Sequence, residues 1–143
     1  MNLIFGHDQA IADWVSKQAS GKPFIPPFHA FGLVNAEGRL VGGFVFTGVN
    51  DKTLELSLAG PATFTRSAWA AVLSYVFDQN DYSRLQMHVS KRNKPLLRML
   101  APVRKSGVKL ENVSECHYGE DHDAVVFSLT RKRLPAFRKK WKI

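Results

Sequence analysis

One short stretch of the chain has the residue types of a phosphate-binding helix start. A Gly-Pro pair at 60–61 ends an alternating apolar segment at 54–58, and an apolar helical periodicity begins a few residues later. Thr63 or Thr65 can cap that helix, which leaves its first backbone N–H groups without helical partners. These donors, the helix dipole and the Arg66 guanidinium suit a pyrophosphate, although many capped helices bind only water. The predicted donors are the amides of Thr65, Arg66, Ser67 and Ala68.

A second polar stretch, residues 116–123, contains a thiol, two imidazoles and three carboxylates in eight residues. Such side chains bind metals, but the stretch lacks CxxC or HxxxH spacing. Gly119 with acidic neighbours is typical of a turn between two strands. The sequence therefore predicts a hairpin at this place and no metal site.

The elements that would position these residues alternate between strands and helices. Strand patterns are found at 3–5, 30–34, 40–48, 54–58 and 84–90, with a hairpin turn at 35–38. Asp8 is predicted to cap a helix that ends near Gly21, and Asn93 leads a later one. A Gly pair at 42–43 indicates a bulge or a close neighbour. This order predicts a mixed central sheet flanked by helices.

The later segments follow the motif order of a known superfamily. They are Arg66-Ser-Ala-Trp69, Tyr75-Val-Phe77, the strand at 85–89, Asn93 with Leu96-Leu97, Gly107-Val108, and Asp123-Ala-Val-Val-Phe-Ser-Leu129. This order resembles the GNAT superfamily of N-acetyltransferases, especially the branch that acetylates the N-termini of ribosomal proteins. The resemblance implies an α/β, GNAT-like acyl-CoA N-acyltransferase fold. It also implies transfer of an acetyl group from acetyl-CoA to an amine.

The resemblance assigns chemical roles to several side chains. Glu55 is the predicted base, because its strand runs beside the acetyl group in GNAT folds and apolar neighbours would raise its pKa; alternatively, it faces water. Ser57 shares that strand face, and Tyr82, Ser90 and His88 are candidate acids. Backbone amides at the strand end would bind the thioester carbonyl. The predicted coenzyme A residues are Leu58, Ala59, Thr65, Arg66, Ser67, Ala68, Asn93 and Arg98.

Two features depart from the family's pattern. The usual pyrophosphate loop reads Gln/Arg-x-x-Gly-x-Gly/Ala, whereas this loop has no glycine after Gly60. Many members carry a Tyr that protonates the leaving thiolate seven residues after the Asn, where this chain has Leu100. These departures support an alternative, a catalytically degenerate GNAT-fold module that binds or assembles.

The positive charge is concentrated in two blocks. The net charge is +8, from 20 Lys and Arg against 12 Asp and Glu. Residues 91–109 and 131–142 each contain seven bases and no acid. We therefore expect an acyltransferase domain at 1–130 and a basic tail at 131–143. With Phe137 and Trp141 among its cations, the tail could dock the protein on DNA or RNA, or it could be solvated and partly disordered.

Composition and the loop at 22–29 set the remaining expectations. A chain of 143 residues with 45% hydrophobic content suits one domain. No apolar stretch approaches the ~20 residues of a membrane span, and no signal-peptide pattern is seen, so we expect a cytoplasmic protein without membrane contact. The acceptor could be a small molecule, a protein N-terminus or a base, and a homodimer is possible. Phe24, Ile25 and Phe28, held by two prolines, either line the acceptor pocket or cover the core.

Overall fold

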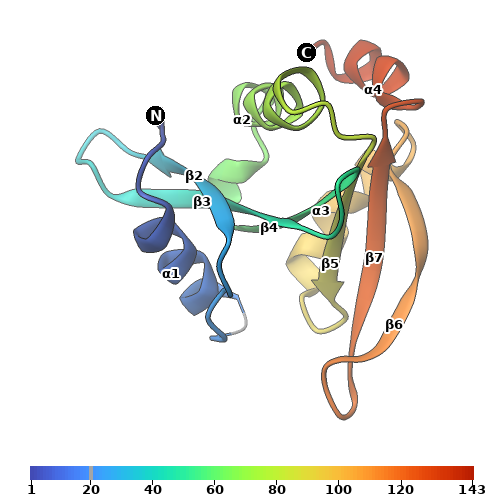
Figure 1. Cartoon of the computed structure of the whole chain (residues 1–143), viewed down its shortest axis with the longest axis horizontal. Helices are drawn as coiled ribbons and strands as arrows, with labels where there is room; N and C mark the ends of the chain where they lie inside the picture. The colour runs from blue at the N-terminus through green and yellow to red at the C-terminus, as the bar shows by residue number, and fades with distance from the viewer. Residues whose placement is uncertain (20) are drawn as a thin grey trace.

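The computed structural model describes residues 1–19 and 21–143 (Figure 1). Across these residues, seven strands form one sheet in the order β1-β2-β3-β4-β5-β7-β6. Neighbouring strands run antiparallel, except that β4 and β5 are parallel. The strands are β1 (Asn2–Ile4), β2 (Phe28–Val34), β3 (Leu40–Gly48), β4 (Thr53–Ala59), β5 (Arg84–Ser90), β6 (Lys109–Gly119) and β7 (His122–Thr130). The predicted mixed sheet is confirmed.

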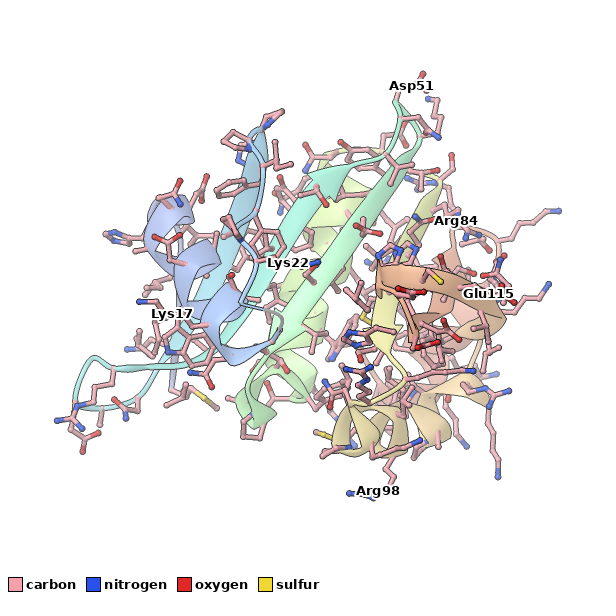
Figure 2. All side chains as sticks on the ribbon, turned by 90° about the horizontal axis from the view of Figure 1, so that it is seen from below. Lys17, Lys22, Asp51, Arg84, Arg98 and Glu115 are labelled. Carbon is pink, nitrogen blue, oxygen red and sulfur yellow. The ribbon has the colours of Figure 1, made fainter. Side chains whose placement is uncertain are left out.

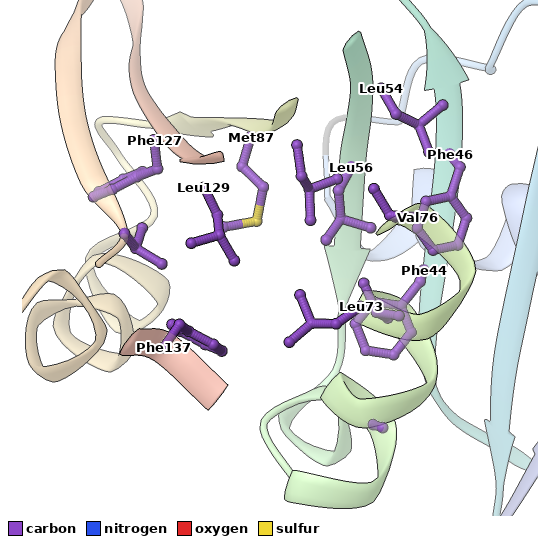
Figure 3. Close-up of a cluster of buried hydrophobic side chains, with 14 of the residues drawn as sticks. Phe44, Phe46, Leu54, Leu56, Leu73, Val76, Met87, Phe127, Leu129 and Phe137 are labelled. Atoms are coloured by element: carbon purple, nitrogen blue, oxygen red, sulfur yellow. The ribbon is translucent and has the colours of Figure 1, made fainter. Parts of the chain in front are cut away.

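Helices cover both faces of the sheet. They are α1 (Asp8–Gln18), α2 (Arg66–Leu73), α3 (Lys94–Arg104) and α4 (Leu134–Trp141), with a 3-10 turn at Pro61–Thr63 and a π-helical segment at Ser74–Gln79. Apolar side chains of α2, α3 and α4 join one large cluster with one face of the strands (Figure 3). A smaller cluster lies between α1 and the opposite face. Within the described residues, no helix combines the length and the apolar composition needed to cross a bilayer.

The predicted close approach at the glycine pair is confirmed. A Cβ on Gly43 would lie 2.6 Å from Cγ2 of Val15, so α1 can pack this closely on β3 only over a glycine. The pairing of β2 with β3 also shifts register between Leu33 and Val34, opposite this stretch. The N-terminus of α1 differs from the prediction. His7 is the N-cap, and Asp8 instead accepts a hydrogen bond from the Ala30 N–H at 3.1 Å, which ties α1 to β2.

The segment expected as a basic tail is ordered and largely helical. Leu134 and Phe137 are 4% and 3% exposed and belong to the large cluster. Arg133 donates to the Gly107 carbonyl at 2.9 Å. Burying apolar side chains stabilises a fold by roughly 25 cal/mol per Å² removed from water. The buried Leu134 and Phe137 therefore hold α4 against the rest of the domain. A solvated, partly disordered tail is therefore wrong, and the Phe137 ring is not available for stacking on bases.

Candidate active site at a fork in the sheet

The parallel strands β4 and β5 pair over a short length and then diverge. Thr53, Leu54 and Glu55 pair with residues 84–86 of β5. Both strands continue beyond this pairing, β4 to Ala59 and β5 to Ser90. Past the last pair, their facing edges have no strand partner among the described residues. Unpaired N–H and C=O groups along such edges can bind an extended ligand as a strand would. We call this opening the fork.

Backbone hydrogen bonds show which groups of β4 face the fork. The Val49 N–H donates to the Thr53 carbonyl at 3.0 Å in the β3–β4 hairpin. In an antiparallel pair the backbone groups alternate in direction, so odd-numbered residues of β4 face β3 and even-numbered residues face β5. Leu58 therefore directs its amide into the fork. Ala59, which pairs with Gly43, directs its amide toward β3, so only the first of the two predicted strand-end amides is open to a ligand.

The same reasoning orients β5. The Arg84 N–H donates to the Lys52 carbonyl at 3.2 Å, on the β4 side. The Lys91 N–H donates to the Asp123 carbonyl at 3.0 Å, on the β7 side. Even-numbered residues of β5 therefore face β4 with their backbone groups. His88 is one of them, and it lies beyond the last paired residue, so its N–H and C=O face the fork.

A carboxylate and an imidazole meet where the strands part. Oε1 of Glu55 contacts Nδ1 of His88, and their side chains are 27% and 17% exposed. Burial raises the pKa of Glu55, but the hydrogen bond and charge of His88, with the charge of His117, outweigh it and lower the pKa below its usual range. The expected rise in the pKa is therefore wrong. Glu55 stays ionised and fixes the His88 ring, whose other nitrogen can take a proton.

The hairpin of β6 and β7 brings further polar rings over this pair. The His117 ring stacks on His88 with centroids 4.3 Å apart and an interplanar angle of 6°. Burial, followed by the charge of His88, lowers the pKa of His117. The Tyr118 ring lies 4.7 Å from His117 and 4.9 Å from His122. Ser90 Oγ lies 2.6 Å from His122 Nε2. The hairpin thus lines the polar side of the fork.

The structure brings some predicted catalytic residues together and separates another. Ser57 lies on the same face of β4 as Glu55 and is half-buried. Tyr82 precedes β5 and packs against the large apolar cluster on the opposite face. Its carbonyl accepts a hydrogen bond from Arg131 at 2.8 Å. Of the candidate acids, Tyr82 therefore does not lie beside Glu55, whereas His88 does.

The start of α2 has the predicted cap. Thr65 is the N-cap, and its hydroxyl accepts a hydrogen bond from the Ala68 N–H at 3.3 Å. The Ala68 amide is thus occupied, while the amides of Arg66 and Ser67 have no helical partner. Thr63, the other candidate cap, instead donates to the Gly60 carbonyl at 2.6 Å.

A cavity of about 360 Å³ opens beside this helix start, between α2, α3 and α4. Thr65 and Arg66 line one part of it, and aromatic rings including Trp69 and Trp141 line much of the rest. The Trp141 Nε1–H is buried and finds no acceptor in the described part of the chain. A buried donor without a partner costs roughly 1–3 kcal/mol, so this group lowers the stability of the fold.

The two predicted coenzyme A residues on the basic helix do not line this cavity. Asn93 caps α3, and its Oδ1 accepts a hydrogen bond from the Leu96 N–H at 3.2 Å. Arg98 is exposed and points away from the molecule (Figure 2). Their contact with coenzyme A stays a prediction. Leu100, at the position of the family's Tyr, is 1% exposed in the apolar core, so no hydroxyl is supplied from there.

The structure also places the polar stretch at 116–123 and the aromatic loop at 22–29. The hairpin at 116–123 is confirmed, with its turn beside Gly119, and no three His, Cys, Asp or Glu side chains of the described residues are placed to hold a metal ion. In the aromatic loop, Phe24 and Phe28 pack on the smaller apolar cluster, whereas Ile25 is 83% exposed. Lys22 reaches from this loop toward the fork and donates to the Tyr118 carbonyl at 3.1 Å (Figure 2).

Comparison with known proteins places the fold. No family model and no curated protein matches the sequence. Solved structures do match. An acetyltransferase-assigned protein of T. thermophilus has 19% identity and a TM-score of 0.66 over 82% of this chain and 66% of that chain. A GCN5-related N-acetyltransferase from Brucella melitensis has 22% identity and a TM-score of 0.64 over 80% of this chain and 56% of that one.

Mutant forms of the spermidine/spermine N-acetyltransferase SpeG from Vibrio cholerae have 12% identity and a TM-score of 0.68 over 97% of this chain and 99% of that one. The chain thus spans less than two thirds of the lengths of the first two structures and nearly all of the third. It has the GNAT acyl-CoA N-acyltransferase fold, as the motif order predicted.

Proposed function

We propose that the chain is an N-acyltransferase that moves an acetyl group from acetyl-CoA directly to an amine. One observation carries the proposal: in a GNAT fold, an ionised carboxylate and a histidine meet at the point where β4 and β5 part. This juxtaposition supports a proton acceptor beside an extended ligand bound in the fork. The predicted Glu55 thus becomes the group that orients His88, and His88 becomes the base.

The residues present fit the donor. The free amides of Arg66 and Ser67 and the Arg66 guanidinium suit the pyrophosphate, and the aromatic wall of the cavity suits the adenine and the pantetheine. The Leu58 amide can polarise the thioester carbonyl. Acetyl-CoA supplies the activated acyl group.

His88 performs the proton transfer in this proposal. Its Nε2 takes the proton of the amine, while Nδ1 stays bound to the Glu55 carboxylate. The negative charge of Glu55 stabilises the imidazolium that forms, and it holds the ring in one orientation. General-base catalysis of this kind contributes about 10²–10⁴-fold to a rate. The half-buried setting strengthens both interactions, because fewer waters compete for them.

Calorimetric titration with acetyl-CoA and with free coenzyme A tests the donor site. We expect micromolar binding to the wild type at moderate salt, and at least tenfold weaker binding to Arg66→Ala. Arg39→Ala is the matched control, because Arg39 is exposed beside the β2–β3 turn and should leave the affinity unchanged. No binding to the wild type would overturn the proposal and favour the degenerate module. Equal affinity in Arg66→Ala would remove this arginine from the site.

The acceptor is a further part of the proposal. A protein N-terminus, a small-molecule amine and a nucleobase amine are all compatible with the fork, and spermidine belongs in the first screen because SpeG is a structural neighbour. Release of free thiol from acetyl-CoA, followed with each amine in turn, identifies the class. Cytoplasmic location and a homodimer remain expectations of the same proposal.

A second candidate function is docking on nucleic acid. Lys105, Lys139 and Lys140 surround a hollow of about 570 Å³ between the end of α3 and α4, and Ser106 lies in its wall. None of these lysines forms an ion pair with an acid of the described residues. The lysines of this cationic hollow can bind phosphate groups, whereas the buried Phe137 ring cannot stack on bases. Docking would therefore depend on the phosphate backbone.

Fluorescence anisotropy with a short DNA duplex at several salt concentrations tests the docking. The wild type should lose affinity steeply with salt, and a double Lys139→Ala, Lys140→Ala variant should reduce the slope by about two phosphate contacts. A double Lys17→Ala, Lys52→Ala variant removes equal charge elsewhere as the control. Equal slopes for both variants, or no binding by the wild type, would rule out this surface.

A further inference from the structure

The hydroxyl of Tyr118 reaches the fork from a distant strand. Tyr118 lies on β6, and β7 separates β6 from β5 in the sheet. Its hydroxyl nevertheless donates to the backbone carbonyl of His88 at 3.1 Å. This carbonyl is one of the groups on the fork side of β5. If the parallel pairing continued past Glu55 in the same register as far as Leu58 and Val89, the same carbonyl would accept a hydrogen bond from the Leu58 N–H. The Tyr118 hydroxyl therefore stands at the opening between the two strands.

Neighbouring groups hold Tyr118 in this position. Its ring contacts the rings of His117 and His122, with centroids 4.7 Å and 4.9 Å away. Its carbonyl accepts the hydrogen bond from Lys22 across the polar face. His122 is itself fixed by Ser90. A side chain held on several sides is preorganised, because it loses little conformational freedom when a ligand binds.

The hydroxyl keeps its proton at neutral pH. Burial, followed by the negative charge of Glu55, raises the pKa of Tyr118 above its ordinary value near 10. The residue therefore enters any reaction at the fork as a proton donor. This matters because Leu100 occupies the position where many GNAT proteins carry their acid, and Tyr82 lies on the opposite face of the sheet.

We propose that Tyr118 is the general acid that protonates the leaving sulfur; this inference rests on the acyltransferase function proposed above. The amine nitrogen forms a bond to the acyl carbon while the carbon–sulfur bond breaks, and its electron pair goes to sulfur. Tyr118 gives its proton to that sulfur. His88 takes a proton from the amine, and that proton restores the tyrosine hydroxyl through solvent. One proton leaves nitrogen and one arrives at sulfur, so no other reactant is needed.

The variant Tyr118→Phe tests this role, because it keeps the ring and removes only the hydroxyl. We expect kcat to fall at least tenfold, with the KM for acetyl-CoA within twofold of the wild type. A binding measurement provides an independent readout. Calorimetry should show coenzyme A binding more tightly than desulfo-coenzyme A in the wild type, and this preference should shrink severalfold in Tyr118→Phe. Tyr82→Phe is the matched control and should preserve the rate and the preference.

The possible outcomes distinguish a failure of the role of Tyr118 from a failure of the proposed acyltransferase function. If the wild type binds neither coenzyme A nor acetyl-CoA, the proposed function fails first. If the wild type binds and transfers, and Tyr118→Phe keeps both the rate and the preference, only the role of Tyr118 is overturned. If Tyr118→Phe lost affinity for coenzyme A and desulfo-coenzyme A alike, the hydroxyl would support the structure of the site. That result would also overturn the role of Tyr118 as the acid. If no acceptor amine is found, the preference for coenzyme A over desulfo-coenzyme A decides whether Tyr118 contacts the sulfur: it should shrink in Tyr118→Phe, and an unchanged preference would overturn the inference.

Discussion

The two faces of β4 and β5 carry opposite chemistry on strands of equal length. One face is apolar and at most 6% exposed, and the other is polar and half-buried. The apolar set is Leu54, Leu56, Leu85, Met87 and Val89; the polar set is Glu55, Ser57, Gln86, His88 and Ser90. Figure 3 shows Leu54 and Leu56 beside Phe46 and Val76, with Met87 across from them beside Leu129. Because side chains alternate along a strand, one residue packs in the core and stabilises the fold, while the next lies on the polar face beside the fork.

Replacing a residue of the apolar face should have the largest effect. Leu56 is 1% exposed in the large cluster, so Leu56→Ala should lower the free energy of unfolding by about 2–5 kcal/mol, because it leaves a cavity. Urea denaturation measures this loss. Ser57→Ala, one residue along and on the other face, should cost less than about 1 kcal/mol. Similar losses in the two variants would show that both faces stabilise the fold equally.

The sequence predicted the parts of this contrast that depend on local spacing. Alternation at 54–58 and 84–90 predicted both strands and the side on which each residue points. The caps at Thr65 and Asn93 were also readable, because a cap is set by residues three positions away. These signals need no knowledge of the remainder of the fold. They sufficed to predict the mixed sheet and the exposed start of α2.

The partners within the site could not be predicted, because they depend on long-range register. His88 meets Glu55 across the fork, and Tyr118 meets His88 across 30 residues of sequence. The pKa of Glu55 was expected to rise because only its apolar sequence neighbours were considered, and the cross-strand histidine reverses the direction. A usable signal did exist: His88 alternates with apolar residues on a strand that has one buried face.

The order of α4 was also readable in principle. Leu134, Phe137 and Trp141 follow the i, i+3, i+7 spacing of an amphipathic helix. The seven bases in the same segment favoured a tail instead. Charge count says how a segment interacts with water, whereas apolar spacing says whether one side of it can be buried, and here the spacing decided the structure.

Changes on the polar face should affect the rate and leave stability nearly unchanged. His88→Gln should lower kcat about 100-fold, because it removes the proposed base. Glu55→Gln should lower it about tenfold, because the ring loses its orienting charge but keeps its nitrogen. Initial rates with acetyl-CoA and the best amine measure both, and coenzyme A affinity should stay within twofold. If Glu55→Gln proved the more damaging variant at every pH, Glu55 itself would be the base.

The smallest expected effect concerns a carboxylate of β6 that stabilises the fold. Glu111 accepts hydrogen bonds from Arg84 at 2.8 Å and from Ser128 at 2.5 Å. The Arg84 hydrogen bond, helped by Ser128, lowers the pKa of Glu111 from 4.5 to about 2. Because the folded pKa lies below the unfolded one, the carboxylate contributes stability above pH 4.5, and that contribution is lost as pH falls toward 2.

Urea unfolding of the wild type and of Glu111→Gln, compared from pH 7 to pH 2, tests this difference. The gap in free energy should be constant above about pH 5 and should close as the carboxylate is protonated. A gap that persisted at pH 2 would mean that Glu111 stabilises by packing. Glu111 and Glu55 both have lowered pKa values, but the partner of Glu111 is a permanently charged arginine, whereas the partner of Glu55 can exchange a proton. The choice of partner thus separates a carboxylate that stabilises the sheet from the one for which we propose a role in catalysis.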